Sequence, residues 1–191
     1  MTKAYVIGIA GGSASGKSTF SDSLEKELQN LRTQTFHMDK YFKPKENRPI
    51  TEAPITGKIY MDDNHPETVD LAKLKEDFFA VLEDQYDVII IEGLLTLWDK
   101  DIHQACDLKL FVDCKADERI VRRIRRNMTW GLTYDQIADV YLDMVRYRHD
   151  EYVEPTKWRA DLILNGSLPT KQALDVIACY IKAAHSAGKN G

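Results

Sequence analysis

Hydrophobic residues follow two patterns along this chain, and the patterns alternate. Short runs of β-branched and aliphatic residues have the length of β-strands, and they lie at 5–10, 33–37, 87–91, 108–112 and 160–164. Between them lie segments with apolar residues at helical spacing, at 18–31, 70–82, 116–128, 134–147 and 170–187. Residues 88–91 are all apolar, which is typical of a strand buried on both faces.

This alternation predicts an α/β fold with an open, mostly parallel sheet and helices on both of its faces. Ligands of such sheets bind at the carboxyl ends of the strands. Residues 39–66 break the alternation, because Pro, Asn and Asp are frequent there, and they predict a long irregular loop of a kind that is often functional. The 191 residues contain no repeat and no linker, so we expect one domain over 1–191.

Composition narrows the class of protein. With 43% hydrophobic and 29% charged residues, the chain is not a disordered tail, and its net charge of −4 argues against a general nucleic-acid binder. No apolar run approaches the ~20 residues that a membrane span needs. Cys106, Cys114 and Cys179 form no CxxC pair, which indicates a reducing compartment. We expect a cytoplasmic protein without nucleic-acid or membrane partners. The sequence does not decide whether the protein forms a homo-oligomer.

The segment between the first strand and the first helix fits the pattern G-x-x-x-x-G-K-[ST]. Its glycines let successive backbone N–H groups curl around an anion, which the positive end of the helix dipole also favours. Lys17 places a charge on the terminal phosphates, and the Ser18 hydroxyl is a magnesium ligand. A glycine-rich turn could match by chance, but the flanking strand and helix are the context that supports the motif. The residues expected to bind the nucleotide are Gly11, Gly12, Ser13, Ala14, Ser15, Gly16, Lys17, Ser18 and Thr19.

A phosphate loop alone is shared by kinases, GTPases and motor ATPases, although the chain lacks the guanine-reading N-K-x-D. Two carboxylates at strand ends add chemistry to it. Asp39 follows the strand at 33–37, where it could accept a proton from an attacking hydroxyl or could cap its own loop. Glu92 follows the apolar strand, and that setting favours magnesium binding, directly or through water, over a solvent-exposed acid.

Arginines form a stripe on the helix predicted at 116–128. They are spaced as i, i+3, i+4 and i+7, at Arg119, Arg122, Arg123 and Arg126. Clustered guanidiniums repel one another unless anions are near, which suits a lid that closes over transferring phosphates. A solvated charged face and a nucleic-acid patch are the alternatives, although no aromatic residue lies within the helix to stack bases. The phosphate loop favours a lid over about 116–147.

Further segments accompany the phosphate loop: Asp39-Lys-Tyr-Phe42, His65-Pro66, Ile91-Glu-Gly-Leu94, Phe111-Val-Asp113, Arg122-Arg-Ile-Arg-Arg126 and Glu154-Pro-Thr-Lys157. Together they resemble the uridine kinase and phosphoribulokinase-like group of P-loop kinases over nearly the whole chain. The resemblance implies a P-loop NTPase fold, with a doubly wound parallel sheet, helices on both faces and a helical lid. It also implies ATP and Mg²⁺ as cofactors and a small-molecule hydroxyl acceptor as the partner.

By that resemblance Asp39 is the catalytic base, and Ser18, Asp39 and Glu92 gather around Mg²⁺. Arg126 meets phosphate, and Arg123 reaches toward the acceptor. The expected catalytic residues are Asp39, Lys17, Arg122, Arg123 and Arg126. The expected substrate residues are Phe42, Asn64, His65 and Arg123.

The chain also departs from uridine kinases. They grip the base with a hairpin between the helix that ends near Gln85 and the strand at 87, and this chain has no such insert. Asn64 replaces the Asp that contacts ribose, and Phe42 replaces a Tyr. A site built to hydrogen-bond a polar base loses discrimination when those partners are absent. The short connection and the run at 39–44 are also similar to nicotinamide riboside kinases.

We therefore expect an ATP-dependent phosphotransferase that moves the γ-phosphate to a primary hydroxyl of a nucleoside or similar small metabolite. The alternatives are a nicotinamide riboside-, sugar- or vitamin-type kinase of the same fold, a nucleotide-binding ATPase without an acceptor, and an RNA-binding protein that uses the arginine helix. The acceptor, the choice of ATP or GTP, and the oligomeric state stay open.

Overall fold

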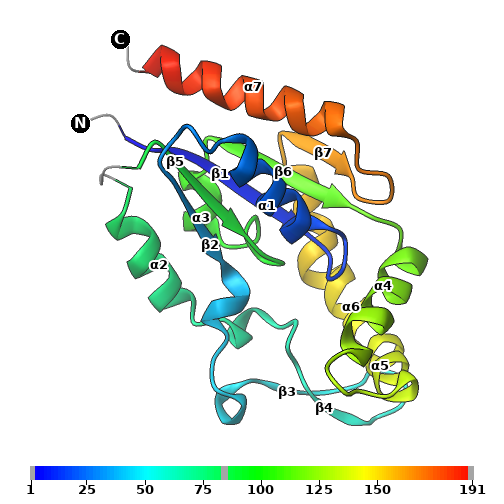
Figure 1. The fold of residues 1–191 in the computed structure, drawn as a ribbon. Helices are drawn as coiled ribbons and strands as arrows, with labels where there is room; N and C mark the ends of the chain where they lie inside the picture. The colour runs from blue at the N-terminus through cyan, green and yellow to red at the C-terminus, as the bar shows by residue number, and fades with distance from the viewer. Residues whose placement is uncertain (1–2, 83–85, 189–191) are drawn as a thin grey trace.

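A five-stranded sheet forms the centre of the protein, in a computed structural model that describes residues 3–82 and 86–188. The strand order is β2-β5-β1-β6-β7, and every neighbouring pair is parallel (Figure 1). The strands are β1 (Tyr5–Gly11), β2 (Thr33–His37), β5 (Val88–Glu92), β6 (Leu108–Asp113) and β7 (Leu162–Asn165). Each lies within two residues of its predicted range, so the parallel α/β fold is confirmed.

Helices cover both faces of the sheet, as predicted. On one face, α1 (Lys17–Glu27) and α7 (Lys171–Gly188) pack against Ile90 of β5 and its neighbours. On the other face lie α2 (Leu71–Ala80) and α3 (Lys100–Ala105). Side chains on successive residues of a strand point to opposite faces. Ile89 therefore faces α2 while Ile90 faces α1, which explains why residues 88–91 are all apolar.

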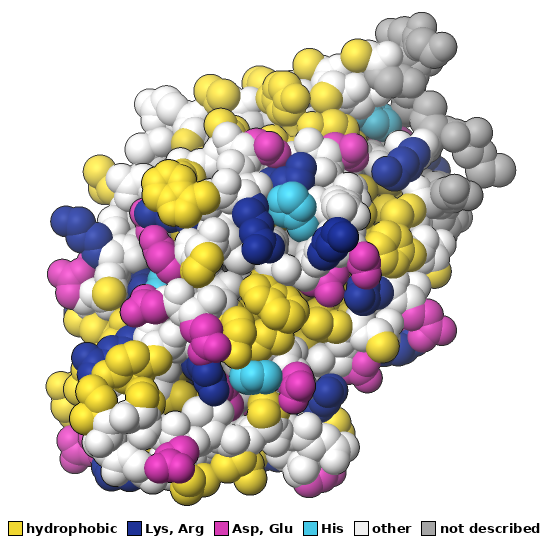
Figure 2. Space-filling view, turned by 180° about the vertical axis from the view of Figure 1, so that it is seen from behind, with side chains coloured by type: hydrophobic (Ala, Val, Ile, Leu, Met, Phe, Trp, Pro, Cys, Tyr) yellow, Lys and Arg dark blue, Asp and Glu magenta, His cyan; other side chains and the backbone are white. Residues whose placement is uncertain are grey.

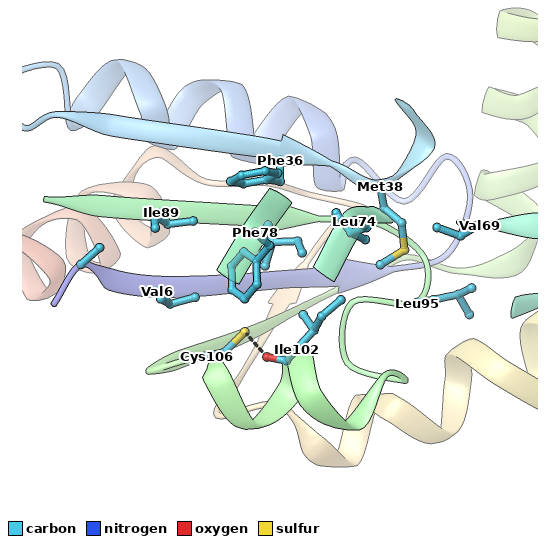
Figure 3. Packing of buried hydrophobic residues seen from close by; sticks show 12 residues of the cluster. Val6, Phe36, Met38, Val69, Leu74, Phe78, Ile89, Leu95, Ile102 and Cys106 are labelled. Carbon is cyan, nitrogen blue, oxygen red and sulfur yellow. Dashed lines mark hydrogen bonds between the residues drawn. The ribbon is translucent and has the colours of Figure 1, made fainter. Parts of the chain in front are cut away.

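Figure 3 shows the core beneath α2. Phe78 is fully buried, and its ring meets Phe36 of β2 edge-to-face at a centroid distance of 5.9 Å. Ile102 of α3 packs into the same cluster, and the Cys106 thiol donates to the Ile102 carbonyl at 3.1 Å. Burial of one such large apolar side chain contributes about 1.5–3 kcal/mol, so these contacts fix both helices on the sheet.

Helix boundaries differ from the predictions in three places. α1 ends at Glu27, four residues before the predicted end at residue 31. The apolar spacing continues past the helix because Leu31 packs on the same core from outside it. The six-residue α3 was not predicted. The second lid helix does not stop at 147: it runs as α5 (Tyr134–Val140), a π turn (Tyr141–Val145), α6 (Arg146–Arg148) and a second π turn (His149–Val153).

Helix starts agree better with the sequence. Asp70 caps α2 by accepting from the Lys73 backbone N–H at 3.0 Å. α4 (Ala116–Met128) has its predicted bounds. Thr133 and Gln136 exchange hydrogen bonds in a capping box that begins α5. The connection expected near Gln85 falls outside the described residues, and α2 itself ends at Ala80.

The prediction of an irregular loop over 39–66 is wrong in part. Two short strands, β3 (Ile50–Glu52) and β4 (Ile59–Met61), pair antiparallel and form a hairpin that extends below the sheet toward α5 (Figure 1). Three-residue strands are too short for alternation to show in sequence. Short 3-10 turns at Met38–Tyr41, Lys45–Asn47 and Pro66–Thr68 frame the hairpin.

The parallel topology brings all five strand ends to one edge of the sheet, above the hairpin and the lid helices. On the face seen in Figure 2, basic and acidic side chains are interspersed rather than gathered into one basic band. Within residues 3–82 and 86–188, no helix combines the length and apolar character that crossing a bilayer requires.

Candidate active site

The phosphate loop connects β1 to α1, at the centre of the sheet edge. Gly16 precedes the helix with φ +101°, a left-handed conformation that favours glycine. At Gly11 (φ +151°) a Cβ atom would lie 2.5 Å from the backbone carbonyl oxygen of Val112, so no side chain fits there. Ala14 adopts φ +63° without being glycine. The loop is therefore a tight backbone curl that opens on the N-terminus of α1, a geometry suited to an anion.

Two groups in this loop have no hydrogen-bond partner among the described residues. Lys17 is 6% exposed, and its ammonium has no hydrogen bond or ion pair with any described residue. The Ser15 hydroxyl is also buried and lacks a partner among the described residues. A buried cation without a counter-charge is costly. A phosphate in the curl would supply the negative charge that Lys17 lacks, so the residues present fit a nucleoside triphosphate.

Ser18 and Glu92 lie together at the foot of the loop. The Ser18 hydroxyl donates to both carboxylate oxygens of Glu92, at 3.3 and 3.2 Å. Glu92 is 3% exposed, and its Oε1 lies 2.9 Å from Nδ1 of His37 at the end of β2. Hydroxyl and carboxylate oxygens are donors that Mg²⁺ prefers. The structure thus brings together two of the three predicted metal ligands, and His37 is a neighbour that the sequence did not reveal.

Two of the predicted lid arginines converge on the loop. Arg123 Nη1 donates to the Ser13 hydroxyl at 3.0 Å, and Arg126 Nη2 donates to the same oxygen at 3.3 Å. Burial, together with the charge of Arg126, lowers the pKa of Arg123 to about 10. Neither guanidinium has a carboxylate within ion-pair distance in the described ranges, and Nε of Arg123 is buried without a partner. Two cations thus face one neutral hydroxyl, where an anion would relieve their repulsion.

The other two arginines of the stripe do not join them. Arg122 Nη1 donates to the Gly166 carbonyl at 2.9 Å, on the opposite side of the loop mouth. Arg119 is buried, and its Nε donates to the Cys114 carbonyl at 3.0 Å. The expected single face is therefore divided among three environments. Arg122 still lines the mouth of the loop, beside Lys17 and Ser18.

A cleft of about 550 Å³ opens between the loop, the hairpin and the lid. Asp39 lies in it, exposed, with Lys17 and the two converging arginines. Burial lowers the pKa of Arg126, and the negative charge of Asp39 partly offsets that effect. The remaining lining carries two further charges, Lys45 and Asp63. Its polar residues are Ser13, Asn64, Asn127 and Gln136, and its apolar surface comes from Phe42, Tyr60, Met61, Leu94, Trp130, Leu132, Ile137 and Val140.

Among the predicted substrate residues, Phe42, Asn64 and Arg123 line this cleft. His65 is not among its lining residues: its Nδ1 accepts from the Glu67 backbone N–H, and its ring packs edge-to-face on Tyr152 at 5.4 Å. The residues that sequence reasoning missed come from the hairpin and the lid. Their only signal was the exposed aromatic Trp130, which follows directly on the arginine helix.

A second cavity, of about 520 Å³, lies on the other side of the phosphate loop. Gly16, Thr19 and Phe20 form one wall, and residues 164–174 form the other. Arg122 connects the two walls through its bond to Gly166. The cavity is mostly apolar and adjoins the loop mouth, so it has the character of a pocket for a flat ring.

Fold and site together define a P-loop protein, in which a glycine curl between β1 and α1 adjoins a cleft lined by Asp39, Arg123 and Arg126. A family model described as "Phosphoribulokinase / Uridine kinase family" matches residues 58–173. The chain belongs to this family.

Relatives in bacteria carry the same assignment. A uridine kinase from Lactococcus lactis is 32% identical, over 95% of this chain and 97% of its own. One from Brevibacillus brevis is 34% identical, over 95% of this chain and 94% of its own. These relatives support an ATP-dependent small-molecule kinase. The Lactococcus match runs over 205 aligned positions, more than the 191 residues of this chain, so that relative has residues that this chain lacks.

Solved structures agree on the fold. Phosphoribulokinase from Rhodobacter spheroides superposes with a TM-score of 0.62 at 14% identity, over 85% of this chain and 70% of that one. Shikimate kinase from Bacteroides thetaiotaomicron gives 0.53 at 14% identity, over 94% of this chain and 97% of that one. At such identities the likeness concerns the fold alone, and it agrees with the predicted P-loop NTPase architecture.

Proposed function

We propose that the protein transfers the γ-phosphate of ATP to a primary hydroxyl of a nucleoside-like small molecule. One observation carries the proposal: Lys17, Arg123 and Arg126, none with a carboxylate partner in the described ranges, line one cleft with Asp39. Unpaired cations at the mouth of a glycine curl suit a phosphate chain, and a carboxylate opposite them suits activation of an alcohol. Residues 1–191 would form one domain, with a lid from about 116 to 147.

The nucleotide would lie across the phosphate loop. The backbone N–H groups of residues 11–19 and Lys17 would bind the β- and γ-phosphates. The apolar cavity between Phe20 and Leu168 would take the base, because it adjoins the loop on the side away from Asp39. Arg122 lies between loop and cavity, bonded to the Gly166 carbonyl, and would hold the two walls around the nucleotide.

Mg²⁺ would be held by Ser18 and Glu92, with Asp39 nearby. When bound, the ion would neutralise charge on the phosphates. The described residues contain no group of three or more His, Cys, Asp or Glu placed to hold a metal. That is compatible with magnesium, which is usually held by one or two carboxylates together with water and phosphate oxygens.

Asp39 would orient the acceptor hydroxyl and take its proton as the oxygen attacks phosphorus. Arg123 and Arg126 would leave the Ser13 hydroxyl and follow the charge that spreads over the transferring group. A phosphate offers these guanidiniums an opposite charge and bidentate geometry, whereas the Ser13 hydroxyl is neutral, so the exchange of Ser13 for phosphate is favourable. Catalysis would then rest on positioning and electrostatics.

The lining of the cleft favours an acceptor with three parts. Its hydroxyl would lie at Asp39, a polar middle would meet Asn64, and a flat or apolar group would lie against Trp130 and Met61. Asn64 is buried, and its side-chain amide has no partner among the described residues, so it has free capacity to hydrogen-bond a ligand. A riboside has this form. A nicotinamide riboside-, sugar- or vitamin-type acceptor is the alternative within the same fold.

A coupled assay of ADP release tests the proposal. The purified protein is mixed with ATP and Mg²⁺ and screened against uridine, cytidine, nicotinamide riboside, fructose and pantothenate. We expect one acceptor to raise ADP release and to gain the mass of one phosphate. Steady ATP hydrolysis that no acceptor stimulates would contradict the kinase and would instead support an ATPase without an acceptor.

A further inference from the structure

The hairpin and the lid meet at one carboxylate. Asp143, in the π turn of the lid, accepts a hydrogen bond from the Thr56 hydroxyl at 2.9 Å and from the Tyr60 hydroxyl at 2.7 Å through the same oxygen. The Lys58 ammonium lies 3.9 Å from that oxygen and 3.4 Å from Asp139. Thr56, Lys58 and Tyr60 all contact lid carboxylates, so this side of the hairpin faces the lid.

The electrostatics agree with a charged Asp143. The hydrogen bond from Tyr60 is the main cause that lowers the pKa of Asp143, with further lowering by Thr56 and Lys58 against the effect of burial. The Asp143 side chain is 13% exposed, whereas that of Asp139, one helical turn earlier, is 57% exposed. The two carboxylates therefore differ in burial and in their number of partners, although they contact the same hairpin.

A second contact lies at the base of the hairpin. Arg148 donates from Nε to Asp62 at 2.6 Å and from Nη2 to Thr51 at 2.9 Å. Asp62 is fully buried, and its other oxygen accepts the Asn64 backbone N–H at 3.0 Å. Asn64 in turn lines the acceptor cleft. Arg148 of the lid is thus connected to the cleft through Asp62 and Asn64.

The hairpin also packs on the lid through Tyr60, which lies against the buried cluster of Tyr141, Met144 and Val145. Its strands have three residues each, and an isolated hairpin of that size is marginal in water. Ile50, Ile55 and Ile59 are 72%, 74% and 63% exposed, so its isoleucines do not anchor it in a core. Its position over the cleft therefore depends on the packing of Tyr60 and on the polar contacts with Asp143 and Arg148.

We propose that Asp143 and Arg148 are positioning residues that lock the hairpin to the lid, so that both move as one wall of the acceptor cleft. Tyr60 and Asn64 on the hairpin side, and Trp130 on the lid side, then form a single surface for the acceptor. Acceptor binding and lid position are coupled through this surface. The inference rests on the proposed function, because it assigns the cleft to the acceptor.

Asp143→Asn tests the lock, with Asp139→Asn as the matched control. The control makes the same chemical change on the same lid and removes only the contact with Lys58. With the acceptor found in the ADP-release screen, we expect Asp143→Asn to raise the acceptor KM about tenfold, while the KM for ATP stays within twofold. Asp139→Asn is expected to leave both constants within twofold. Equal acceptor KM values for the two variants, or an equal rise in the KM for ATP, would overturn the proposal.

Hydrogen exchange gives a second readout that needs no acceptor. Amides of residues 50–61 are expected to exchange at least about tenfold faster in Asp143→Asn than in Asp139→Asn, while amides of β1 and β5 keep their protection. Unchanged exchange in the hairpin would overturn the lock. If the wild-type protein phosphorylates no acceptor but the exchange difference appears, the proposed kinase activity fails and the coupling of hairpin to lid stands.

Discussion

The two ends of the active site are built differently. The phosphate end comes from one continuous stretch, residues 11–18, whose backbone curl is fixed by β1 and α1 on either side. The acceptor end is assembled from the hairpin, the turn around Asn64 and the lid, which are far apart in the chain. At the phosphate end, Lys17, Arg123 and Arg126 have no carboxylate partner in the described structure, whereas at the acceptor end Asp62 and Asp143 are already paired.

This difference reflects what each end would recognise. A phosphate chain is the same in every reaction of such an enzyme, so it can be bound by a rigid loop whose neighbouring cations have no carboxylate partners. An acceptor differs from enzyme to enzyme, so its wall is carried by segments that can be exchanged without altering the sheet. The consequence is that substitutions at the two ends should change different constants.

The largest expected effect is at the point where the two ends meet. Asp39→Asn keeps the size of the side chain and removes the base, so kcat for acceptor phosphorylation should fall by about 10²–10⁴-fold. ATP affinity by calorimetry should stay within twofold. Glu46→Gln, which changes an exposed carboxylate a few residues further along, is the control and should leave kcat unchanged. A parental kcat in Asp39→Asn would contradict the assignment of the base.

A core substitution should affect neither end selectively. Phe78→Ala removes a fully buried ring and should lower the free energy of unfolding by about 3–5 kcal/mol in urea titrations. Its neighbour Phe79 is 41% exposed, so Phe79→Ala should cost about 1 kcal/mol or less. Equal losses for the two variants would show that α2 does not pack on the sheet as described.

The phosphate end alone is tested by Lys17→Ala. The Lys17 ammonium would make a charge-assisted hydrogen bond to phosphate worth about 1.5–3 kcal/mol, so the Kd for ATP should rise roughly 10- to 100-fold when it is removed. Lys26→Ala, an exposed lysine on the same helix, serves as the control. If calorimetry finds the same ATP affinity in Lys17→Ala and the parent, the assignment of this loop to nucleotide binding is contradicted.

The smallest effect is expected at the acceptor end. Trp130→Ala removes an aromatic wall of the cleft, and ring contacts are worth about 0.5–1.5 kcal/mol, so the acceptor KM should rise roughly two- to tenfold without a change in ATP affinity. Trp158 is 79% exposed and lies outside the cleft, so Trp158→Ala should match the parent. A changed ATP affinity in Trp130→Ala would show that the two ends are not separate.

The same contrast explains what the sequence could predict. The strands and the phosphate loop were predictable because their signals are local: apolar runs of strand length, and a glycine pattern next to a lysine. Clustering of Ser18 with Glu92 followed from parallel topology, which places strand ends at one edge. Asp39 also lies in the cleft as this reasoning expects, although its role as base stays a prediction.

The rest depends on contacts between distant segments. The division of the arginine stripe follows from the position of Gly166 and Cys114, whose carbonyls take Arg122 and Arg119. The hairpin strands are too short to show a period, and their partner Asp143 lies 83 residues beyond Tyr60. Helical spacing on its own cannot state which residues of a face meet an anion and which meet a carbonyl.

A crystal structure with a non-hydrolysable ATP analogue and Mg²⁺ tests the central claim most directly. The account predicts the triphosphate inside the curl of residues 11–18, the base in the cavity beside Phe20, and the guanidiniums of Arg123 and Arg126 turned from Ser13 to the terminal phosphate. A triphosphate bound elsewhere, or Asp39 directed away from the terminal phosphorus, would contradict it.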